Sequence, residues 1–226
     1  MDLDAHLIKT PWDARAIDLD TFQVVDASPE VLQAITDAKR QGHYTVRIEP
    51  LASKKSLHEH DFYYCDTLIE PYCTPNQLVE FQHENLALSK AVELSALLKI
   101  CHGAFSHDRF HRDFNIASNR ADIRYDLWLK DLYDAGKVFG LFYQDQLAGF
   151  LGVLETKLVL HALSENYRGQ GLAKRFWSLT CNELFQQGHL EVSSSISMSN
   201  TKAINLYASL GFRFRSPFDI YHRLIV

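Results

Sequence analysis

Short runs of hydrophobic residues alternate with polar turns in the second half of the chain. Val138 to Tyr143 and Leu147 to Leu154 both read as strands, and the polar Gln144 to Gln146 between them predicts a hairpin. A further strand is expected from Lys157 to Leu163, where apolar residues again alternate with other residues. The pattern therefore predicts three consecutive strands in this region.

Hydrophobic residues at helical spacing flank these strands. Leu88 to Phe105 and Ile123 to Tyr133 precede them as two expected helices. After the strands come a helix that reaches about Gln187, a strand at Leu190 to Ile196, a helix that begins at Asn200, and a last strand. This alternation is typical of a mixed central sheet with flanking helices.

The first part of the chain has a different pattern. Ser28-Pro29 marks the start of a helix, and a strand follows it. A second strand, rich in aromatic residues, is expected from His60 to Ile69, and Pro71 then interrupts the chain. We therefore expect a smaller α/β lobe over residues 1–85 and a main domain of α+β or α/β class over residues 86–226.

Composition and charge narrow the class of partners. Hydrophobic residues make up 46% of the 226 residues, which is ordinary for a folded protein. The formal net charge is −5, so we expect neither nucleic acid nor a membrane surface as a partner. The acidic opening stretch lacks the apolar segment of a signal peptide, and no apolar run reaches the about 18 residues of a membrane-spanning helix. A cytoplasmic location is the resulting expectation.

Cysteines and histidines are the residues from which a metal site would be built. The four cysteines are scattered without a C-x-x-C pair, so we expect reduced, buried thiols rather than a disulfide or a metal site. His107 and His111 have the spacing of two ligands on one helix face, but their segment reads as a loop. The sequence therefore predicts no metal.

The strand that ends at Leu163 runs into a glycine-rich turn at the start of a helix. Gly169 and Gly171 lack a Cβ, so the backbone there can turn tightly and approach a ligand closely. The first turn of the following helix has N–H groups without internal partners, at the positive end of the helix dipole. Arg168 adds a positive charge. These features favour a pyrophosphate ligand, although two glycines before a helix are often only a turn.

A second informative segment lies about thirty residues further on. Asn200 reads as the N-cap of a helix and Gly211 as its C-cap. Together with the glycine turn, it resembles the GNAT superfamily of acyl-CoA-dependent N-acyltransferases over about residues 90–226. The matching residues are Arg168, Gly171 and Ala173 in the first signature, and Asn200, Ala203, Leu206, Tyr207, Gly211 and Phe212 in the second.

The resemblance implies a GNAT fold and acetyl-CoA as the acyl donor. It implies that the pyrophosphate is held by Arg168, Gly169, Gln170, Gly171, Leu172 and Ala173. It also implies contacts from Ala162 and Leu163 to the pantetheine arm and the thioester carbonyl, and a hydrogen bond from Asn200 to the cofactor. The chain departs from the family at Glu165-Asn166, where a proline often precedes the turn.

Tyr207 is the expected general acid for the coenzyme A thiolate. A phenol with a reference pKa of about 10 is protonated at neutral pH and can donate its proton to a thiolate. The resemblance to the family favours this role. The alternative is that Tyr207 only packs its helix against the sheet.

The sequence offers two candidates for the general base. Glu155 ends the second hairpin strand, where a carboxylate could deprotonate an ammonium group. His161 has a reference pKa of about 6.5, which suits the same task. The alternatives are a solvated surface role for Glu155, a hydrogen-bonded core role for His161, and a water relay without a single base.

Charged and aromatic residues gather after the first expected helix of the main domain. His107, Arg109, Phe110 and Arg112 lie on a connection that, by the resemblance, helps to wall the acceptor pocket. Arginine and histidine side chains could hold phosphates or carboxylates, and Phe110 could stack on a ring. The alternative is a solvated loop held by salt bridges.

The layout of the whole chain is similar to the dTDP-fucosamine acetyltransferase family, which acylates the amine of a nucleotide-linked sugar. The similarity rests on an N-terminal lobe with Trp12-Asp13, the Arg109-Phe110 pair after the first helix, and Trp128 in the next helix. It implies a nucleotide amino sugar as the small-molecule acceptor. A protein N-terminus, a lysine or a small amine as acceptor stays open, as do a non-catalytic acyl-CoA sensor and a homodimer.

Overall fold

The computed structural model describes residues 2–82 and 84–226, and the chain forms two compact units. The first unit combines the chain up to Leu68 with Ser106–Arg124 and Pro217–Val226. The second unit contains Ile69–Phe105 and Tyr125–Ser216. This division differs from the predicted lobe and main domain, because two segments beyond residue 85 pack with the N-terminal residues.

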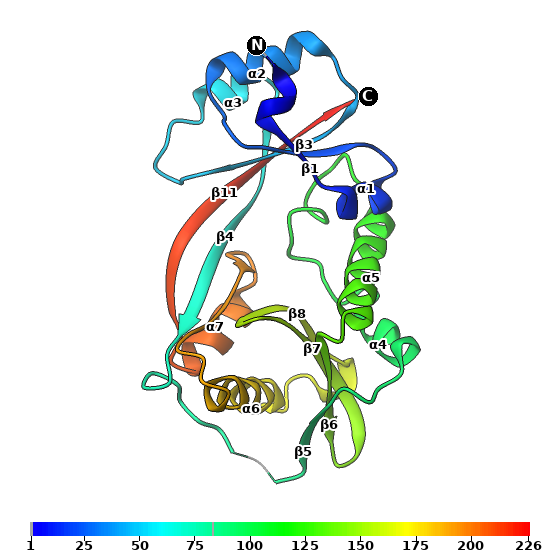
Figure 1. Ribbon diagram of the computed structural model, residues 1–226, viewed down its shortest axis with the longest axis vertical. Helices are drawn as coiled ribbons and strands as arrows, with labels where there is room; N and C mark the ends of the chain where they lie inside the picture. Colours follow the sequence, from blue (N-terminus) through cyan, green and yellow to red (C-terminus); the bar gives the residue numbers. More distant parts are fainter. Residues whose placement is uncertain (1, 83) are drawn as a thin grey trace. The chain divides into compact units, whose positions relative to one another are not determined.

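A mixed sheet forms the centre of the second unit (Figure 1). Its strands are, in spatial order, β4 (Tyr63–Cys73), β9 (Val192–Ser194), β8 (Lys157–Leu163), β7 (Gln146–Leu154), β6 (Val138–Tyr143) and β5 (Leu86–Ser89). Neighbouring strands in this sheet are antiparallel, except β8 and β9, which are parallel. A parallel pair needs a crossover connection, and α6 (Leu172–Gln186) provides it. A short strand, β10 (Ile196–Ser197), pairs with β4.

Helices cover both faces of this sheet. On one face, α4 (Leu94–Cys101) and the second-unit part of α5 (Ser118–Asp134) share a hydrophobic cluster with Phe150 of β7 and Leu160 of β8. On the other face, α6 and α7 (Thr201–Ser209) share a cluster with the neighbouring strand residues Leu151 and Leu158. Figure 1 shows α6 running along the strands, close to α7. Successive residues of a strand thus pack against helices on opposite faces of the sheet.

A β-bulge in β8 changes which side chains face α6 and α7. The register pairs Gly152 with Leu160 but Val153 with Leu158, so Val159 is an extra residue. Val159 and Leu160 both pack toward α4 and α5. Because of this shift, the next residue, His161, faces α6 and α7. Among the described residues, β8 pairs with β9 only through Lys157 and Leu158, and beyond the bulge the two strands are unpaired.

The first unit has its own sheet and core. Its strands are β1 (Leu7–Lys9), β2 (Thr21–Val24), β3 (Gly42–Ile48) and β11 (Arg213–Ile225), of which β2 and β3 are parallel. Its short helices are α1 (Pro11–Ile17), α2 (Pro29–Ala38) and α3 (Lys55–Glu59). Leu32 of α2 packs in the core of this unit together with Phe22 of β2 and Tyr44 of β3. The chain also contains two 3₁₀ helices, η1 (Leu3–His6) and η2 (Glu165–Tyr167).

Most predicted elements are present, several with shifted bounds, such as β4, which begins at Tyr63 and not at His60, and α5, which begins at Ser118 and not at Ile123. The hairpin and the strand at Lys157–Leu163 are confirmed. The helix expected to start at Leu88 is wrong there, because Leu86 and Leu88 alternate in β5, which pairs with β6, and α4 begins only at Leu94. Pro71 does not end its strand, because β4 continues to Cys73. The strand expected at Leu190 is split into β9 and β10.

Of the helices in the described part of the chain, none is both long and apolar enough to cross a membrane.

Candidate active site

The turn between β8 and α6 exposes an open helix N-terminus. Gly169 and Gly171 have φ angles of +75° and +73°, in the left-handed region that favours glycine. A Cβ on Gly169 would meet nothing within 4 Å, so the turn faces open space. Gly171 is the N-cap of α6 and supplies no side-chain acceptor. The first N–H groups of α6 are therefore available for an anionic ligand.

Arg168 ties this turn to the end of β8. Its Nε donates a hydrogen bond of 2.8 Å to the carbonyl oxygen of Leu163, and its guanidinium lies 3.9 Å from Glu165. Gln170 in turn donates to the carbonyl oxygen of Asn166 at 2.6 Å. The structure thus brings several of the predicted cofactor-binding residues together at one end of β8.

The predicted cap of α7 is confirmed. The Asn200 side chain accepts a hydrogen bond of 3.0 Å from the backbone N–H of Ala203. The helix that follows carries Tyr207, whose side chain is fully buried and packs on Phe212 with ring centroids 4.9 Å apart. Asn200 therefore fixes the start of the helix that places Tyr207.

Three rings from three elements meet between the sheet and the helices; we call His161, Trp177 and Tyr207 the ring cluster. The His161 ring of β8 lies edge-on to Trp177 of α6 at 4.9 Å and to Tyr207 of α7 at 6.2 Å. Among the described residues, His161 Nδ1, Trp177 Nε1 and the Tyr207 hydroxyl are buried without a hydrogen bond partner. The sequence analysis did not single out Trp177, because it stands in neither family signature.

Burial controls the charge of the two titratable rings. It raises the pKa of Tyr207 well above its ordinary value, and the nearby Ser194 and Trp177 side chains offset only part of this effect. Burial lowers the pKa of His161 to about 4. Both side chains are therefore neutral at pH 7.

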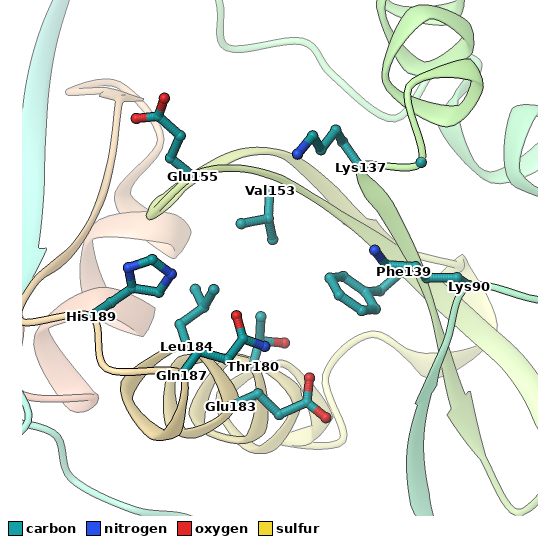
Figure 2. Close-up of a pocket in the computed structure, with 11 residues that line it drawn as sticks. Lys90, Lys137, Phe139, Val153, Glu155, Thr180, Glu183, Leu184, Gln187 and His189 are labelled. Atoms are coloured by element: carbon teal, nitrogen blue, oxygen red, sulfur yellow. The ribbon is translucent and has the colours of Figure 1, made fainter.

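Glu155 lies at the opposite end of β8 from the glycine turn. It occupies the turn between β7 and β8 with a φ of +54°. His161 lies opposite Leu151 of β7, three residues from Leu154 at the edge of this turn, which corresponds to about 10 Å along the strand. Glu155 instead lines a cavity of about 250 Å³. Figure 2 shows Glu155 and Lys137 along one side of this cavity, with Glu183 and Gln187 of α6 along the other.

The residues predicted to wall the acceptor pocket lie in the first unit. Phe110 is buried, and the guanidinium groups of Arg109 and Arg124 lie 4.5 and 4.3 Å from its ring centroid. Arg112 donates to the buried carboxylate of Asp66 at 2.9 Å. His107 is exposed. Phe110 is thus covered by cations, and Arg112 has a structural partner.

A buried carboxylate next to these residues forms a hub that the sequence analysis missed. Asp113 accepts hydrogen bonds from His43 Nε2 at 3.0 Å, His222 Nδ1 at 2.8 Å, the Tyr63 hydroxyl at 2.9 Å and the Asn115 N–H at 2.9 Å. Burial alone would raise the pKa of Asp113, but the hydrogen bonds from His222 and His43 outweigh it and lower the pKa. No local signal could reveal this hub, because its members are far apart in sequence.

The same hub is the group in the described residues whose side chains are spaced as metal ligands. Atoms of His43, Asp113 and His222 lie within 4.8 Å of one another. The hydrogen bonds already occupy the carboxylate, and Arg109 acts on His222 electrostatically. A dication there would meet this positive charge. The prediction that the protein uses no metal therefore stays in place.

The glycine turn, the open helix N-terminus and the divergence of β8 from β9 are typical of proteins that bind a phosphate-bearing ligand at a strand end. Residues 104–212 match the model of the acetyltransferase (GNAT) family. The fold is that of the GNAT acetyltransferases, and residues 104–212 form a GNAT-family N-acetyltransferase domain.

Solved structures with this fold cover nearly the whole chain. A GCN5-related N-acetyltransferase from Sphaerobacter thermophilus has 13% identity and a TM-score of 0.66, over 97% of this chain and 75% of that chain. A GNAT-family acetyltransferase from Colwellia psychrerythraea has 12% identity and a TM-score of 0.59, over 91% and 80%. A tandem GNAT protein from the clavulanic acid biosynthesis pathway has 9% identity and a TM-score of 0.54, over 92% and 78%. No curated protein matches the chain.

Proposed function

We propose that the protein transfers an acetyl group from acetyl-CoA to a primary amine, by direct attack of the amine in a ternary complex. The observation that carries this proposal is the open N-terminus of α6, which follows a glycine turn at the end of β8. Near the same end of β8, the ring cluster contains three buried polar atoms without a hydrogen bond partner among the described residues. Native proteins leave few such atoms unsatisfied, so a ligand is the simplest explanation.

The residues of the β8–α6 turn fit a pyrophosphate. The backbone N–H groups of Gly169 to Ala173 would hold it, and Arg168 would add charge at the mouth. Ala162 and Leu163 would meet the pantetheine arm, because β8 is unpaired with β9 at this level. Asn200 would contribute its side-chain amide, since capping uses only the oxygen. The bound donor supplies the thioester that the amine attacks.

Tyr207 is the proposed general acid. Its hydroxyl is protonated at neutral pH and has no partner among the described residues, so its hydrogen is available for the departing sulfur. The apolar surroundings also exclude water, which would otherwise compete for this hydrogen.

A water relay is the form of general base that we favour. His161 has a pKa of about 4, so it is a weak acceptor for a proton from an ammonium group. Glu155 lies about 10 Å along the strand from the level of His161, too far for a direct hydrogen bond to an amine held there. His161 thus lacks the pKa of a general base, and Glu155 lacks the position. Water molecules at the amine would carry the proton away instead.

We propose a nucleotide-linked amino sugar as the acceptor. GNAT enzymes act on small-molecule or peptide amines. The choice of a nucleotide-linked sugar among these acceptors rests on the cationic and aromatic residues around Arg109. Arg109 and His107 are the proposed contacts to an anionic group, while Phe110 is buried behind Arg109 and Arg112 is bound to Asp66. A cytoplasmic location and a homodimer remain predictions of the sequence analysis.

The first experiment tests donor binding. Gly171→Asp places a negative charge at the N-terminus of α6 and should raise the KM for acetyl-CoA about 10- to 150-fold, the range of one charge-assisted contact. Gly188→Asp is the matched control, because Gly188 also has a positive φ and open space around its Cα, at the other end of α6. Equal KM values for the two variants would refute the proposed pyrophosphate site.

The second experiment tests catalysis and the acceptor. Release of coenzyme A, followed with a thiol reagent, is measured with nucleotide amino sugars, peptides and small amines. A nucleotide amino sugar should be the best acceptor, and Arg109→Lys should raise its KM, because only a guanidinium makes bidentate contacts to phosphate. Arg120→Lys in the same unit should change little. A cationic peptide as best acceptor would refute the sugar assignment, and donor binding without any transfer would indicate a sensor.

A further inference from the structure

The ring cluster is uncharged, and each of its three polar groups carries one hydrogen that it can donate. An indole N–H can only donate, and the Tyr207 hydroxyl is protonated at neutral pH. His161 is neutral, so its ring carries one N–H. The titratable groups beside these rings are the thiols of Cys181 on α6 and Cys73 on β4, and burial raises the pKa of both. They are therefore neutral as well.

The shifts of the two rings arise without any carboxylate or guanidinium. Burial is the cause of the lowered pKa of His161, and Ser194, Trp177 and Cys181 are the other groups that act on Tyr207. The Ser194 hydroxyl donates to the carbonyl oxygen of Leu158 at 2.6 Å, so its hydrogen is already used. The environment thus presents unsatisfied donors to whatever enters it, and no competing negative charge. Such an environment suits an anion.

We propose that Trp177 and His161 form, together with Tyr207, a binding site for the sulfur anion that leaves the thioester. This proposal rests on the proposed function and adds two residues to it. The indole N–H of Trp177 and the ring N–H of His161 donate hydrogen bonds to the sulfur while it is negatively charged. They donate to the Tyr207 oxygen once Tyr207 has given up its proton. Trp177 and His161 thereby lower the energy of the charged state that proton transfer passes through.

The step balances as follows. The amine nitrogen attacks the thioester carbonyl carbon, a C–N bond forms, and the C–S bond breaks with its electron pair on sulfur. Tyr207 gives its hydroxyl proton to that sulfur. The proton lost by the amine passes to solvent, and the Tyr207 oxygen takes a proton from solvent when the products leave. Until then the negative charge is on the sulfur or on the phenolate, which Trp177 and His161 would stabilise.

The bulge in β8 is what makes this site. It places His161 on the face of α6 and α7, where the ring meets Trp177 at 4.9 Å and Tyr207 at 6.2 Å. Trp177 acts on Tyr207 in the direction that lowers its pKa, against the larger effect of burial, as a donor beside a phenolate would. The two neighbours of Tyr207 are thus positioned before any ligand arrives.

Coenzyme A itself is the probe for the test, because its free thiol can be titrated without turnover. The ultraviolet absorbance of the bound thiolate is followed against pH, and the same titration with desulfo-coenzyme A is subtracted to remove protein signals. The thiol of bound coenzyme A should have a pKa below that of the free molecule. Trp177→Phe keeps the ring but deletes the donor, and should raise the bound pKa by about 1 to 2 units, the range of one hydrogen bond to a charged group.

The matched control is Trp128→Phe. Trp128 lies on α5 and packs in the cluster on the opposite face of the sheet, so this variant should titrate like the parent. In turnover, Trp177→Phe should lower kcat about 10- to 150-fold with the KM for acetyl-CoA unchanged. A structural role alone would lower thermal stability without moving the thiol pKa.

The thiol pKa of bound coenzyme A decides the proposal. A lowered thiol pKa in the parent that rises in Trp177→Phe supports it. Binding of coenzyme A with an unperturbed thiol overturns it and leaves the proposed function intact, as does a Trp177→Phe variant that titrates like Trp128→Phe. If coenzyme A does not bind the parent protein at all, the proposed function itself fails. Should Trp177→Phe not fold, His161→Phe takes its place, because it also removes a ring N–H, and a thiol pKa equal to that of the parent would then overturn the proposal.

Discussion

Two buried polar clusters, one in each unit, contain histidines but differ in how their polar atoms are satisfied. In the first unit, Asp113 accepts four hydrogen bonds from other side chains and the backbone. In the second unit, the ring cluster leaves three polar atoms without a partner among the described residues. A satisfied network holds segments of chain together, whereas an unsatisfied one costs stability until something binds.

The difference indicates what each cluster is for. The Asp113 hub joins β3, β4 and β11 to the loop before α5, which are segments far apart in the sequence. The far nitrogen of His222 is the one side-chain atom of the hub without a partner in the described structure. The ring cluster joins only three neighbouring elements and lacks a carboxylate. We therefore assign the hub to folding and the ring cluster to chemistry.

The largest effect is expected at Tyr207. Tyr207→Phe keeps the buried ring and deletes only the hydroxyl, so kcat should fall about 10²–10⁴-fold, the usual contribution of a general acid. The free energy of unfolding should stay the same or rise, because the variant removes a buried hydroxyl that has no partner. Steady-state kinetics and urea unfolding measure the two quantities. Normal kcat in this variant would make Tyr207 a packing residue only.

A substitution of Asp113 is expected to lower stability and to leave donor binding unchanged. Asp113→Ala leaves the donors of His43, His222 and Tyr63 without an acceptor, so the free energy of unfolding should fall by about 3 kcal/mol. Asp134→Ala is the control, because its exposed ion pair with Lys130 contributes under about 1 kcal/mol. Affinity for acetyl-CoA, measured by calorimetry, should be unchanged. Equal stability of the two variants would contradict the structural assignment of the hub.

The pH dependence of stability offers a third comparison. His161 has a folded-state pKa of about 4, below the unfolded value of about 6.5, so the unfolded chain binds more protons between these values. Stability should therefore be full above pH 6.5 and fall as the pH drops toward 4. His161→Gln should reduce the slope in this window by up to about 1.4 kcal/mol per pH unit.

Unfolding free energies of the His161 variant at several pH values measure this slope, with the exposed His58→Gln as the control. His222, whose pKa burial lowers to about 3, supplies a similar slope in both proteins. An unchanged slope in His161→Gln would mean that the pKa of His161 is not lowered by folding. His161 would then again be a candidate for the general base.

The smallest effect is expected at Glu155. Glu155→Gln removes a carboxylate from the turn between β7 and β8, far along the strand from the ring cluster. The kcat and its pH profile should match those of the parent, because a water relay needs no carboxylate at this position. A kcat that falls while stability is retained would identify Glu155 as the base and would contradict the relay.

Local patterns in the sequence predicted the parts of the site that depend on neighbouring residues. The glycine turn, the strand before it and the Asn200 cap follow from backbone requirements within a few residues, and each lies where it was predicted. The resemblance to the acetyltransferase signature points to Tyr207 as well, and its role as general acid stays a proposal. Helix and strand boundaries failed where two periods overlap, as at Leu88, which fits both a helix and β5.

The remaining features depend on contacts between distant residues. Trp177 reads as an ordinary apolar position of α6, and only the packing of β8 against α6 reveals its unpartnered nitrogen. The Asp113 hub unites residues that are more than 100 positions apart. The bulge at Val159 has no sequence signal either, because the strand reads as regular from Lys157 to Leu163. Periodicity carries no information about such pairings.

The bulge at Val159 affects β8 in two ways. It changes the phase of the strand, which means the face to which each following side chain points, and it changes the curvature of the backbone. The phase decides which side chains face α6, and the curvature decides how far β8 stays beside β9. Deleting Val159 would keep His161 on the same face, because the extra residue is the one removed. We expect the strand to straighten, however, so that its backbone beyond Leu158 runs closer to the residues that follow β9. The same rings would then remain while the proposed donor site beside β8 becomes narrower, so a residue without a functional group would control access to that site.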